Sequence, residues 1–256
     1  MARMTTEVID PTSSAIGSLV SAVDWRDVSE QLDAYGCAVV PDLLTTDQCD
    51  KLRSMYSDDA RFRSRVVMAR HGFGRGEYKY FGYPLPPDVA ALRTALYPHL
   101  AGLANRWNEH LGIAGRFPPD HAEFLRRCHD AGQTKPTPLL LQYGAGDYNC
   151  VHQDLYGEHV FPLQVTCLLS RPDLTRSGPP SADFTGGEFV LTEQRPRMQS
   201  RVEVVPLAQG DAVIFAVRER PVHGTRGWYR VNLRHGVSRV RSGHRYTLGI
   251  IFHDAK

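Results

Sequence analysis

The segment from Gln142 to Asp154, QYGAGDYNCVHQD, contains the residues best suited to chemistry, His152-Gln153-Asp154. Side chains of an extended chain alternate between two sides, so His152 and Asp154 are expected to point the same way. An imidazole and a carboxylate placed like this can bind one metal ion together. Because His-x-Asp is common by chance, and each residue alone is explained as an ordinary surface or core side chain, the pattern needs a second histidine from a distant segment.

Two histidines further along the chain, His223 and His235, are candidates for the third ligand. We favour His235 because Arg245 follows it by ten residues, with a predicted turn at Ser242-Gly243 between them. A hairpin of this length would place His235 and Arg245 on neighbouring strands that face one pocket. Two histidines and a carboxylate with open coordination positions are the ligand set of non-haem Fe(II) oxygenases. The planar guanidinium of Arg245 is suited to bidentate binding of a carboxylate.

Together these motifs resemble the Fe(II)/2-oxoglutarate-dependent dioxygenase superfamily, over roughly residues 138–253. Similarity to its prolyl-4-hydroxylase branch lies in the pattern YxxGxYxxxHxD from Tyr143, in GGEFVL at Gly186–Leu191 and in GDAVIF at Gly210–Phe215. The chain is also similar to a bacterial family of such oxygenases that is loosely described as acting on alkylated DNA. It departs from the alkylated-DNA demethylases at Ile251, where they carry a second arginine. This departure favours the hydroxylase branch.

The resemblance implies a set of roles. The catalytic residues that hold Fe(II) would be His152, Asp154 and His235. Arg245 would bind the far carboxylate of 2-oxoglutarate, helped by the hydroxyl of Tyr143 or, as a second choice, of Thr247. With O2, the enzyme would convert 2-oxoglutarate to succinate and CO2 while it oxidises a primary substrate. The protein contributes geometry and water exclusion, and the cofactors carry the chemistry.

Three further side chains are candidate substrate contacts: Tyr148, His223 and Arg226. His223 is explained more simply as a pocket-wall or loop residue. The stretch 195–245 contains eleven arginines, no lysine and three acidic residues. Such a run is either a solvated strand face or a basic rim that attracts an acidic partner such as nucleic acid. No RNP motif, zinc finger or helix-turn-helix signature is visible, so the sequence does not indicate direct recognition of base sequence.

The order of elements predicts an α+β fold with a double-stranded β-helix (jelly-roll, cupin-like) core and N-terminal buttressing helices. Residues 1–20 are expected to be a flexible tail, and 21–256 a single domain with a helical part at 21–135 and a catalytic core at 136–254. Helices are predicted at 24–35, 45–55, 88–111 with a break or kink at Pro98, and 120–129. Strands are predicted at 138–143, 161–169, 188–191, 202–205, 212–217, 231–237 and 246–252. The segments 71–87 and 170–185 are expected to be irregular loops.

Composition narrows the class of protein further. The formal net charge of the 256 residues is +2, and 42% of them are hydrophobic, which is ordinary for a globular chain. The longest apolar run, Ala212–Val217, is too short to span a bilayer, and the first residues do not form a secretory signal. Five scattered cysteines without a CxxC pair indicate free thiols, as in a reducing compartment. We therefore expect a cytoplasmic protein without a membrane partner.

The sequence leaves several functions to compare. The leading hypothesis is hydroxylation of a protein side chain or an amino-acid-like small molecule, and the main alternative is oxidative demethylation of alkylated nucleic acid at the same site. A non-catalytic jelly-roll binding module would leave Arg245 without a role. A zinc hydrolase with the same three ligands would also leave Arg245 without a role, and it lacks an obvious general base. The substrate atom and the oligomeric state stay open at this level.

Overall fold

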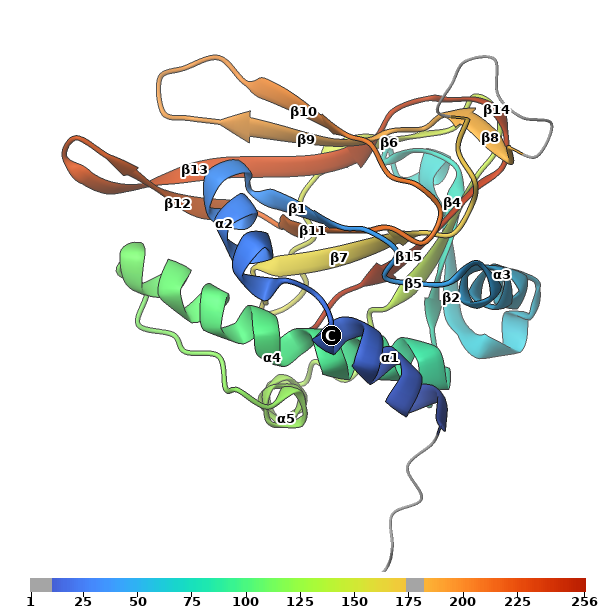
Figure 1. Cartoon of the computed structure of the whole chain (residues 1–256), viewed down its shortest axis with the longest axis horizontal. Coiled ribbons are helices and arrows are strands. Elements are labelled where there is room, and N and C mark those ends of the chain that lie inside the picture. The colour runs from blue at the N-terminus through green and yellow to red at the C-terminus, as the bar shows by residue number, and fades with distance from the viewer. Residues whose placement is uncertain (1–10, 174–181) are drawn as a thin grey trace, which may run out of the picture.

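Two antiparallel sheets face each other and carry the residues singled out above (Figure 1). The structure, a computed structural model, describes residues 11–173 and 182–256. The larger sheet has seven strands in the order β1 (Cys37–Val40), β11 (Ala212–Ala216), β7 (Leu163–Leu168), β15 (Arg245–Ile250), β5 (Leu139–Tyr143), β4 (Glu77–Phe81) and β2 (Phe62–Val67). The other has six strands, β10 (Arg201–Val205), β9 (Phe189–Gln194), β13 (Gly227–Val237), β6 (Tyr148–His152) and β3 (Gly74–Arg75), with β12 (Glu219–Gly224) paired to β13. A small third sheet joins β8 (Phe184–Gly186) to β14 (Val240–Gly243).

The helices of the described part are α1 (Pro11–Ser21), α2 (Trp25–Tyr35), α3 (Thr46–Ser54), α4 (Pro87–His110) and α5 (His121–Asp130). Helices α1, α4 and α5 lie on the side of the seven-stranded sheet away from the other sheet, whereas α2 lies beside β1 and also contacts β12 (Figure 1). Short 3-10 turns lie at Met55–Ser57, Asp59–Arg61 and Met68–Arg70. The burial of strand β11, AVIFA, is complete because helices cover one of its faces and the second sheet covers the other. In β13, by contrast, buried and exposed residues alternate through its middle, because one of its faces lies outside.

Local sequence signals explain where several elements begin and end. The helix predicted at 45–55 begins with a capping box: the Thr45 side chain accepts from Gln48 N, and the Gln48 side chain accepts from Thr45 N. Asp24 caps α2, and Gly36 ends it in the left-handed conformation. A break or kink was expected at Pro98, and the break is wrong, because α4 runs through this residue. Buried residues on both sides of Pro98 hold the helix to the sheet, and this packing outweighs the lost hydrogen bond.

Two expected irregular regions turn out to be ordered elements. The expectation of a flexible tail is wrong for residues 11–20, because α1 occupies them and buries Ile16 and Val20. Residues 1–10 lie outside the described part. The segment 71–87 contains β3 and β4, each of which extends a sheet. Because this segment is rich in glycine and proline, the alternation of charged and aromatic residues in Glu77–Phe81 was not interpreted as a strand. Glu77–Phe81 pairs with β5 on one side and with β2 on the other. Residues 174–181 of the second expected loop also lie outside the described part.

The strands predicted downstream of residue 136 are all present, with ends that differ by a few residues. The strands missed in that part of the chain are β6, β8, β12 and β14, which are short or lack a strong apolar pattern. No helix in the described part of the chain is long and apolar enough to cross a membrane. The fold thus places β6 and β13 in one sheet, and β5 and β15 in the sheet that faces it.

Candidate active site

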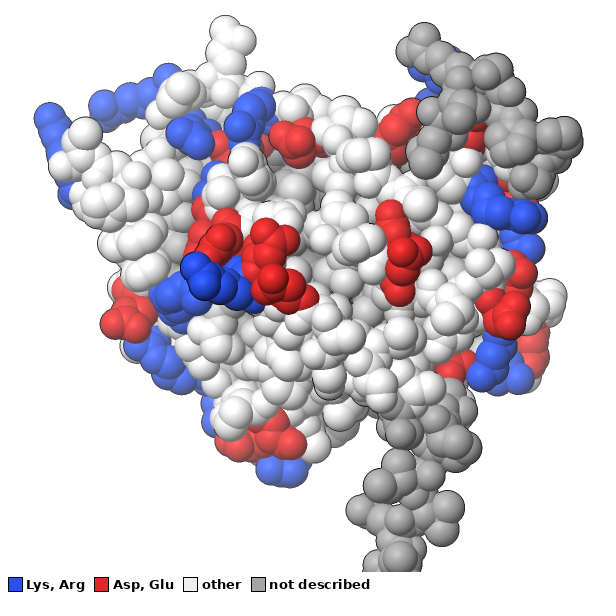
Figure 2. Space-filling model, viewed as in Figure 1, with Lys and Arg blue, Asp and Glu red and all other residues white. Residues whose placement is uncertain are grey.

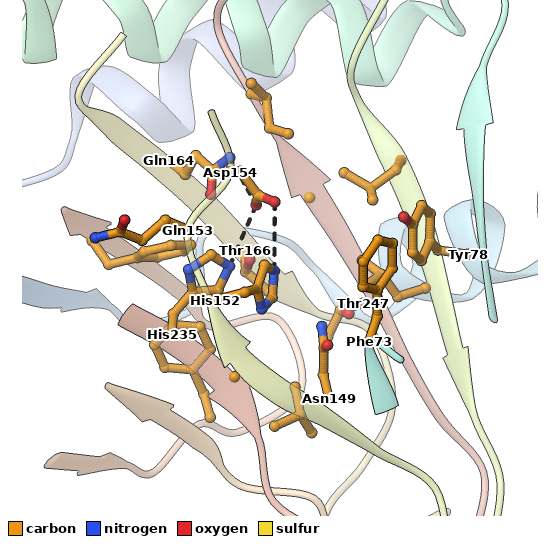
Figure 3. A pocket seen from close by; sticks show the side chains of 18 of the residues that line it. Phe73, Tyr78, Asn149, His152, Gln153, Asp154, Gln164, Thr166, His235 and Thr247 are labelled. Carbon is orange, nitrogen blue, oxygen red and sulfur yellow. Dashed lines mark hydrogen bonds and ion pairs between the residues drawn. The ribbon is translucent and has the colours of Figure 1, made fainter. Parts of the chain in front are cut away.

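The two histidines lie directly opposite each other on neighbouring strands. His152 ends β6 and pairs in register with His235 of β13. Asp154 follows two residues after the end of β6, and its carboxylate oxygens lie 3.5 Å from His152 Nε2 and 3.4 Å from His235 Nε2. All three ligand atoms lie within 4.8 Å of one another (Figure 3). Metal bonds of about 2 Å can bridge such separations, so the arrangement fits a single ion held on one side.

Hydrogen bonding prepares His152 for this role. Its Nδ1 lies 2.8 Å from the carbonyl oxygen of Cys150. A carbonyl oxygen can only accept a hydrogen bond, so Nδ1 must carry the proton. The lone pair of Nε2 is then free to face Asp154 and a metal ion. Burial lowers the pKa of His235 and favours its neutral, ligating form, although Asp154 opposes this shift. Burial alone would raise the pKa of Asp154, but the two histidines outweigh it and hold that pKa well below its ordinary value.

The expected carboxylate-binding residues face the triad from the other sheet. Arg245 of β15 pairs in register with Tyr143 of β5, and its guanidinium carbon lies 5.5 Å from the centre of the tyrosine ring. Thr247 lies two residues on, on the same side of β15, and is buried. Gly187 leaves room for the arginine, because a Cβ there would lie 2.9 Å from Arg245 Cδ. The Gly186-Gly187 pair of the sequence motif therefore has a local steric reason.

Arg245 is a buried cation that the described residues do not neutralise. Its side chain is 1% exposed, and neither Nε nor Nη1 has a hydrogen-bond partner among residues 11–173 and 182–256. The Tyr143 hydroxyl beside it is buried and equally without a partner in that part of the chain. Burial lowers the pKa of Arg245 to about 10, so it keeps its charge at neutral pH. Burial raises the pKa of Tyr143, which therefore stays a neutral donor. A carboxylate of a ligand would satisfy both groups.

One cavity of about 350 Å³ joins the two halves of the site. Its walls include the triad, Arg245, Tyr143 and Thr247. Most of the remaining wall is apolar or aromatic and comes from both sheets (Figure 3). The expectation that His235 and Arg245 lie on neighbouring strands is wrong, because β13 and β15 belong to different sheets. Strand β14 pairs with β8 between them and carries the chain across, so the two residues face one cavity from opposite walls.

The three expected substrate contacts lie outside this cavity. Tyr148 is exposed on β6 but does not line the cavity wall. His223 and Arg226 belong to the β12–β13 hairpin, where the ring of His223 packs against Trp228 at 4.9 Å. The structure therefore gives these residues no contact with the triad. Sequence reasoning missed Tyr156 and Gln164, which both hydrogen-bond Asp154. Tyr156 continues the two-residue period of His152 and Asp154, which is the signal that could have found it.

A family model described as "Oxygenase, catalysing oxidative methylation of damaged DNA" matches residues 76–255. The chain belongs to this oxygenase family. An uncharacterized protein of Mycobacterium tuberculosis H37Rv, Rv2227, is 44% identical over 208 residues, which cover 81% of this oxygenase and 83% of that protein. The family makes the chain an oxidoreductase, as expected.

Solved structures show the same fold. One is a prolyl hydroxylase from Trichoplax adhaerens in complex with a peptide fragment of hypoxia inducible factor, at 15% identity and a TM-score of 0.53, covering 96% of this oxygenase and 93% of that chain. Another is a 2OG-Fe(II) oxygenase family oxidoreductase from Burkholderia pseudomallei, at 15% identity and a TM-score of 0.51, covering 91% and 93%. The fold is therefore the expected double-stranded β-helix of the 2OG-Fe(II) oxygenases. Fe(II), 2-oxoglutarate and O2, the expected cofactor and co-substrates, agree with this family and fold.

Proposed function

We propose that this oxygenase hydroxylates a protein side chain and couples the reaction to conversion of 2-oxoglutarate into succinate and CO2. In this proposal Fe(II) is held by the three residues of the triad, His152, Asp154 and His235. Arg245 and Tyr143 bind the far carboxylate of 2-oxoglutarate, and Thr247 lines the same end of the cavity. The observation that carries the proposal is the buried guanidinium of Arg245, which has donors without partners among the described residues and faces the triad across one cavity.

The chain's own contribution is binding, orientation and exclusion of water. When bound, Fe(II) and 2-oxoglutarate supply the oxidation: one atom of O2 ends in succinate, with loss of CO2, and the other in the hydroxyl of the product. Arg245 fixes the far end of the co-substrate at the cavity wall opposite the triad, because a charge-assisted pair in a buried site is strong and directional. The apolar walls limit access of bulk water to Asp154 and His235, whose side chains are 15% and 10% exposed, while His152 is 35% exposed.

The cavity wall also bears on the substrate. Apart from the triad and Arg245, no Asp, Glu, Lys, Arg or His is found among the described residues that line it. A free amino acid carries an ammonium and a carboxylate, and burying either without a partner is costly. An uncharged side chain of a larger molecule, whose backbone stays outside, avoids this cost. The cavity therefore favours a protein side chain over a free amino acid.

Oxidation of nucleic acid is the second candidate, and two observations favour it. The family description names damaged DNA. At the cavity wall, Phe73 is 49% exposed and stacks on His71 with ring centres 5.3 Å apart, and Arg75 nearby in β3 is exposed. An exposed aromatic ring beside basic groups can stack on a base and attract phosphate.

The arginine-rich stretch gives weaker support to this second candidate. Figure 2 shows basic side chains over the β9–β10 and β12–β13 hairpins at one end of the molecule. Several of them form ion pairs on these hairpins: Arg195 and Arg220 contact Glu193, and Arg230 contacts Glu219. Only two glutamates take part, so these pairs offset two of the eleven arginine charges and the stretch stays strongly positive. The expected basic rim lies on these hairpins, away from the cavity that holds the triad.

The test measures succinate formed by the full chain with Fe(II), O2 and 2-oxoglutarate. Three substrate classes are added separately: a library of unstructured peptides, the free amino acids, and a methylated single-stranded oligonucleotide. We expect peptides to stimulate succinate formation and to gain the mass of one oxygen atom. The matched variants are His152→Ala, which should lose this activity, and His223→Ala, a histidine outside the cavity, which should keep it. Stimulation by the oligonucleotide alone, or full activity of His152→Ala, would contradict the proposal.

A further inference from the structure

Asp154 differs from the two histidines in how the backbone holds it. His152 and His235 lie within paired strands, whereas Asp154 lies in the segment after β6. Its carboxylate is instead fixed by side chains. The hydroxyl of Tyr156 donates to Oδ1 at 2.8 Å, and Nε2 of Gln164 donates to Oδ2 at 3.1 Å. Each carboxylate oxygen therefore accepts one neutral hydrogen bond in addition to its contact with a histidine.

Tyr156 is itself held from two directions. The hydroxyl of Tyr80, on β4, lies 3.2 Å from that of Tyr156, and the two rings meet edge to face. On the backbone side, Nε2 of the buried Gln133 donates to Tyr156 O at 3.2 Å. Oε1 of Gln133 accepts from Glu158 N at 2.9 Å and from His159 N at 2.7 Å. The segment after Asp154 is thus tied to the rest of the fold at several points.

Gln164 approaches from the opposite sheet. It lies on β7, which pairs with β11 and β15, and its side chain is 3% exposed. A buried amide needs hydrogen-bond partners, and the Asp154 carboxylate supplies one. Figure 3 shows Gln164, His152 and His235 arranged around Asp154. The Asp154 carboxylate is therefore contacted from three parts of the fold. The histidines belong to the six-stranded sheet, Tyr156 to the loop of Asp154 itself, and Gln164 to the seven-stranded sheet.

We propose that Tyr156 and Gln164 are positioning residues that set the orientation of the Asp154 carboxylate toward the metal ion, with Tyr80 acting through Tyr156. The inference rests on the proposed iron site. Residues that hydrogen-bond a metal ligand fix its orientation, and their loss lowers metal affinity by roughly 10- to 100-fold. In this site the effect should be large, because the backbone of Asp154 is outside the strand ladder and the carboxylate would otherwise rotate.

The experiment titrates the full-length apoprotein with Fe(II) under anaerobic conditions and records the dissociation constant and the apoprotein melting temperature. Tyr156→Phe removes one hydroxyl, and Gln164→Met keeps the side-chain volume without the donor. The matched control is Tyr246→Phe, which removes a hydroxyl that accepts from Gln142 at 2.6 Å. We expect Fe(II) affinity to fall roughly 10- to 100-fold in Tyr156→Phe and Gln164→Met, by a smaller factor in Tyr80→Phe, and not in Tyr246→Phe.

Wild-type affinity in both Tyr156→Phe and Gln164→Met overturns the positioning role. An affinity loss that is matched by Tyr246→Phe and accompanied by the same fall in apoprotein melting temperature also overturns it, because the effect would then be general loosening of the fold. If the wild-type chain itself does not bind Fe(II), the proposed iron site is wrong. This result differs from failure of the positioning role, in which the wild-type chain binds Fe(II) and the variants bind it equally well.

Discussion

Two arginines of this oxygenase are equally buried and differ in what surrounds them. Arg93 on α4 and Arg245 on β15 are each 1% exposed. Arg93 donates to Asp254 Oδ1 at 2.7 Å, to Ile251 O at 2.8 Å and to Tyr83 OH at 3.1 Å. Arg245 leaves Nε and Nη1 without partners among the described residues. The fold satisfies the first cation and leaves donors of the second open toward a cavity.

This difference separates a structural group from a functional one. Burying a charge without a partner costs free energy, and a protein retains such an arrangement where a ligand completes it. Arg93 closes a network that joins α4 to the C-terminal segment, so its loss should affect folding. Arg245 faces the triad, so its loss should affect binding of the co-substrate.

Replacing Arg93 by methionine should strongly destabilise the fold. Arg93→Met leaves the buried carboxylate of Asp254 without its guanidinium, and breaking a buried pair in this way costs about 3–5 kcal/mol. Urea denaturation of the two apoproteins measures the change in unfolding free energy. Arg245→Met is the matched control, because it removes a buried arginine that has no ion pair among the described residues. Its unfolding free energy should equal or exceed that of wild type. If the two variants lose equal stability, the contrast is wrong.

The same Arg245→Met variant should fail in the use of 2-oxoglutarate. Truncating one partner of a buried charged pair costs about 2–5 kcal/mol, so kcat/KM for 2-oxoglutarate should fall by roughly 30- to 5000-fold. Initial rates of succinate formation over a range of 2-oxoglutarate concentrations give this ratio. An unchanged requirement for 2-oxoglutarate would remove Arg245 from the binding site.

Binding of 2-oxoglutarate should stabilise the folded state through Arg245. At a concentration 100 times its dissociation constant, a ligand that binds only the folded state adds about 2.7 kcal/mol. Thermal unfolding with and without 2-oxoglutarate, in the presence of a divalent metal ion, measures this gain. We expect the shift in wild type and in Arg93→Met but not in Arg245→Met. A full shift in Arg245→Met would place the carboxylate elsewhere.

The neighbourhood of Arg93 should also lose stability in mild acid. Burial, followed by the charge of Arg93, lowers the pKa of both His121 and His253 to about 4. An unfolded histidine binds a proton below about pH 6.5, so stability falls from that pH toward 4, by about 1 kcal/mol per histidine between pH 7 and 5.5. Denaturation curves at several pH values measure the slope. His121→Gln should reduce this slope, and an unchanged slope would contradict the assignment.

The sequence could predict the site residues whose task, binding a metal ion or a carboxylate, only a few residue types can perform. A His-x-Asp pair, a distant histidine and an arginine ten residues later select one metal chemistry, and the structure brings all four side chains to one cavity. Short-range rules succeeded as well, as the capping box at Thr45 shows. These signals work because they depend on a few nearby residues or on the properties of a single ion.

What the sequence could not predict depends on contacts between distant segments. Tyr80 meets Tyr156 across 76 positions, and β4, which carries Tyr80, is concealed in a segment rich in glycine and proline. Asp254 is fully buried and pairs with Arg93, which lies 161 positions away in the sequence. The division of His235 and Arg245 between two sheets likewise follows from pairing of β14 with β8. Only the assembled fold reveals such partners.

The most direct test of the two-sided site is an anaerobic titration of the apoprotein, first with Fe(II) and then with 2-oxoglutarate, followed by visible absorption. We expect a weak charge-transfer band that needs both additions. We expect no band at the same concentrations in His235→Ala or Arg245→Met, one from each wall of the cavity. Absence of the band in the wild-type protein, or its full intensity in either variant, would contradict the assignment of the iron and 2-oxoglutarate sites to this cavity.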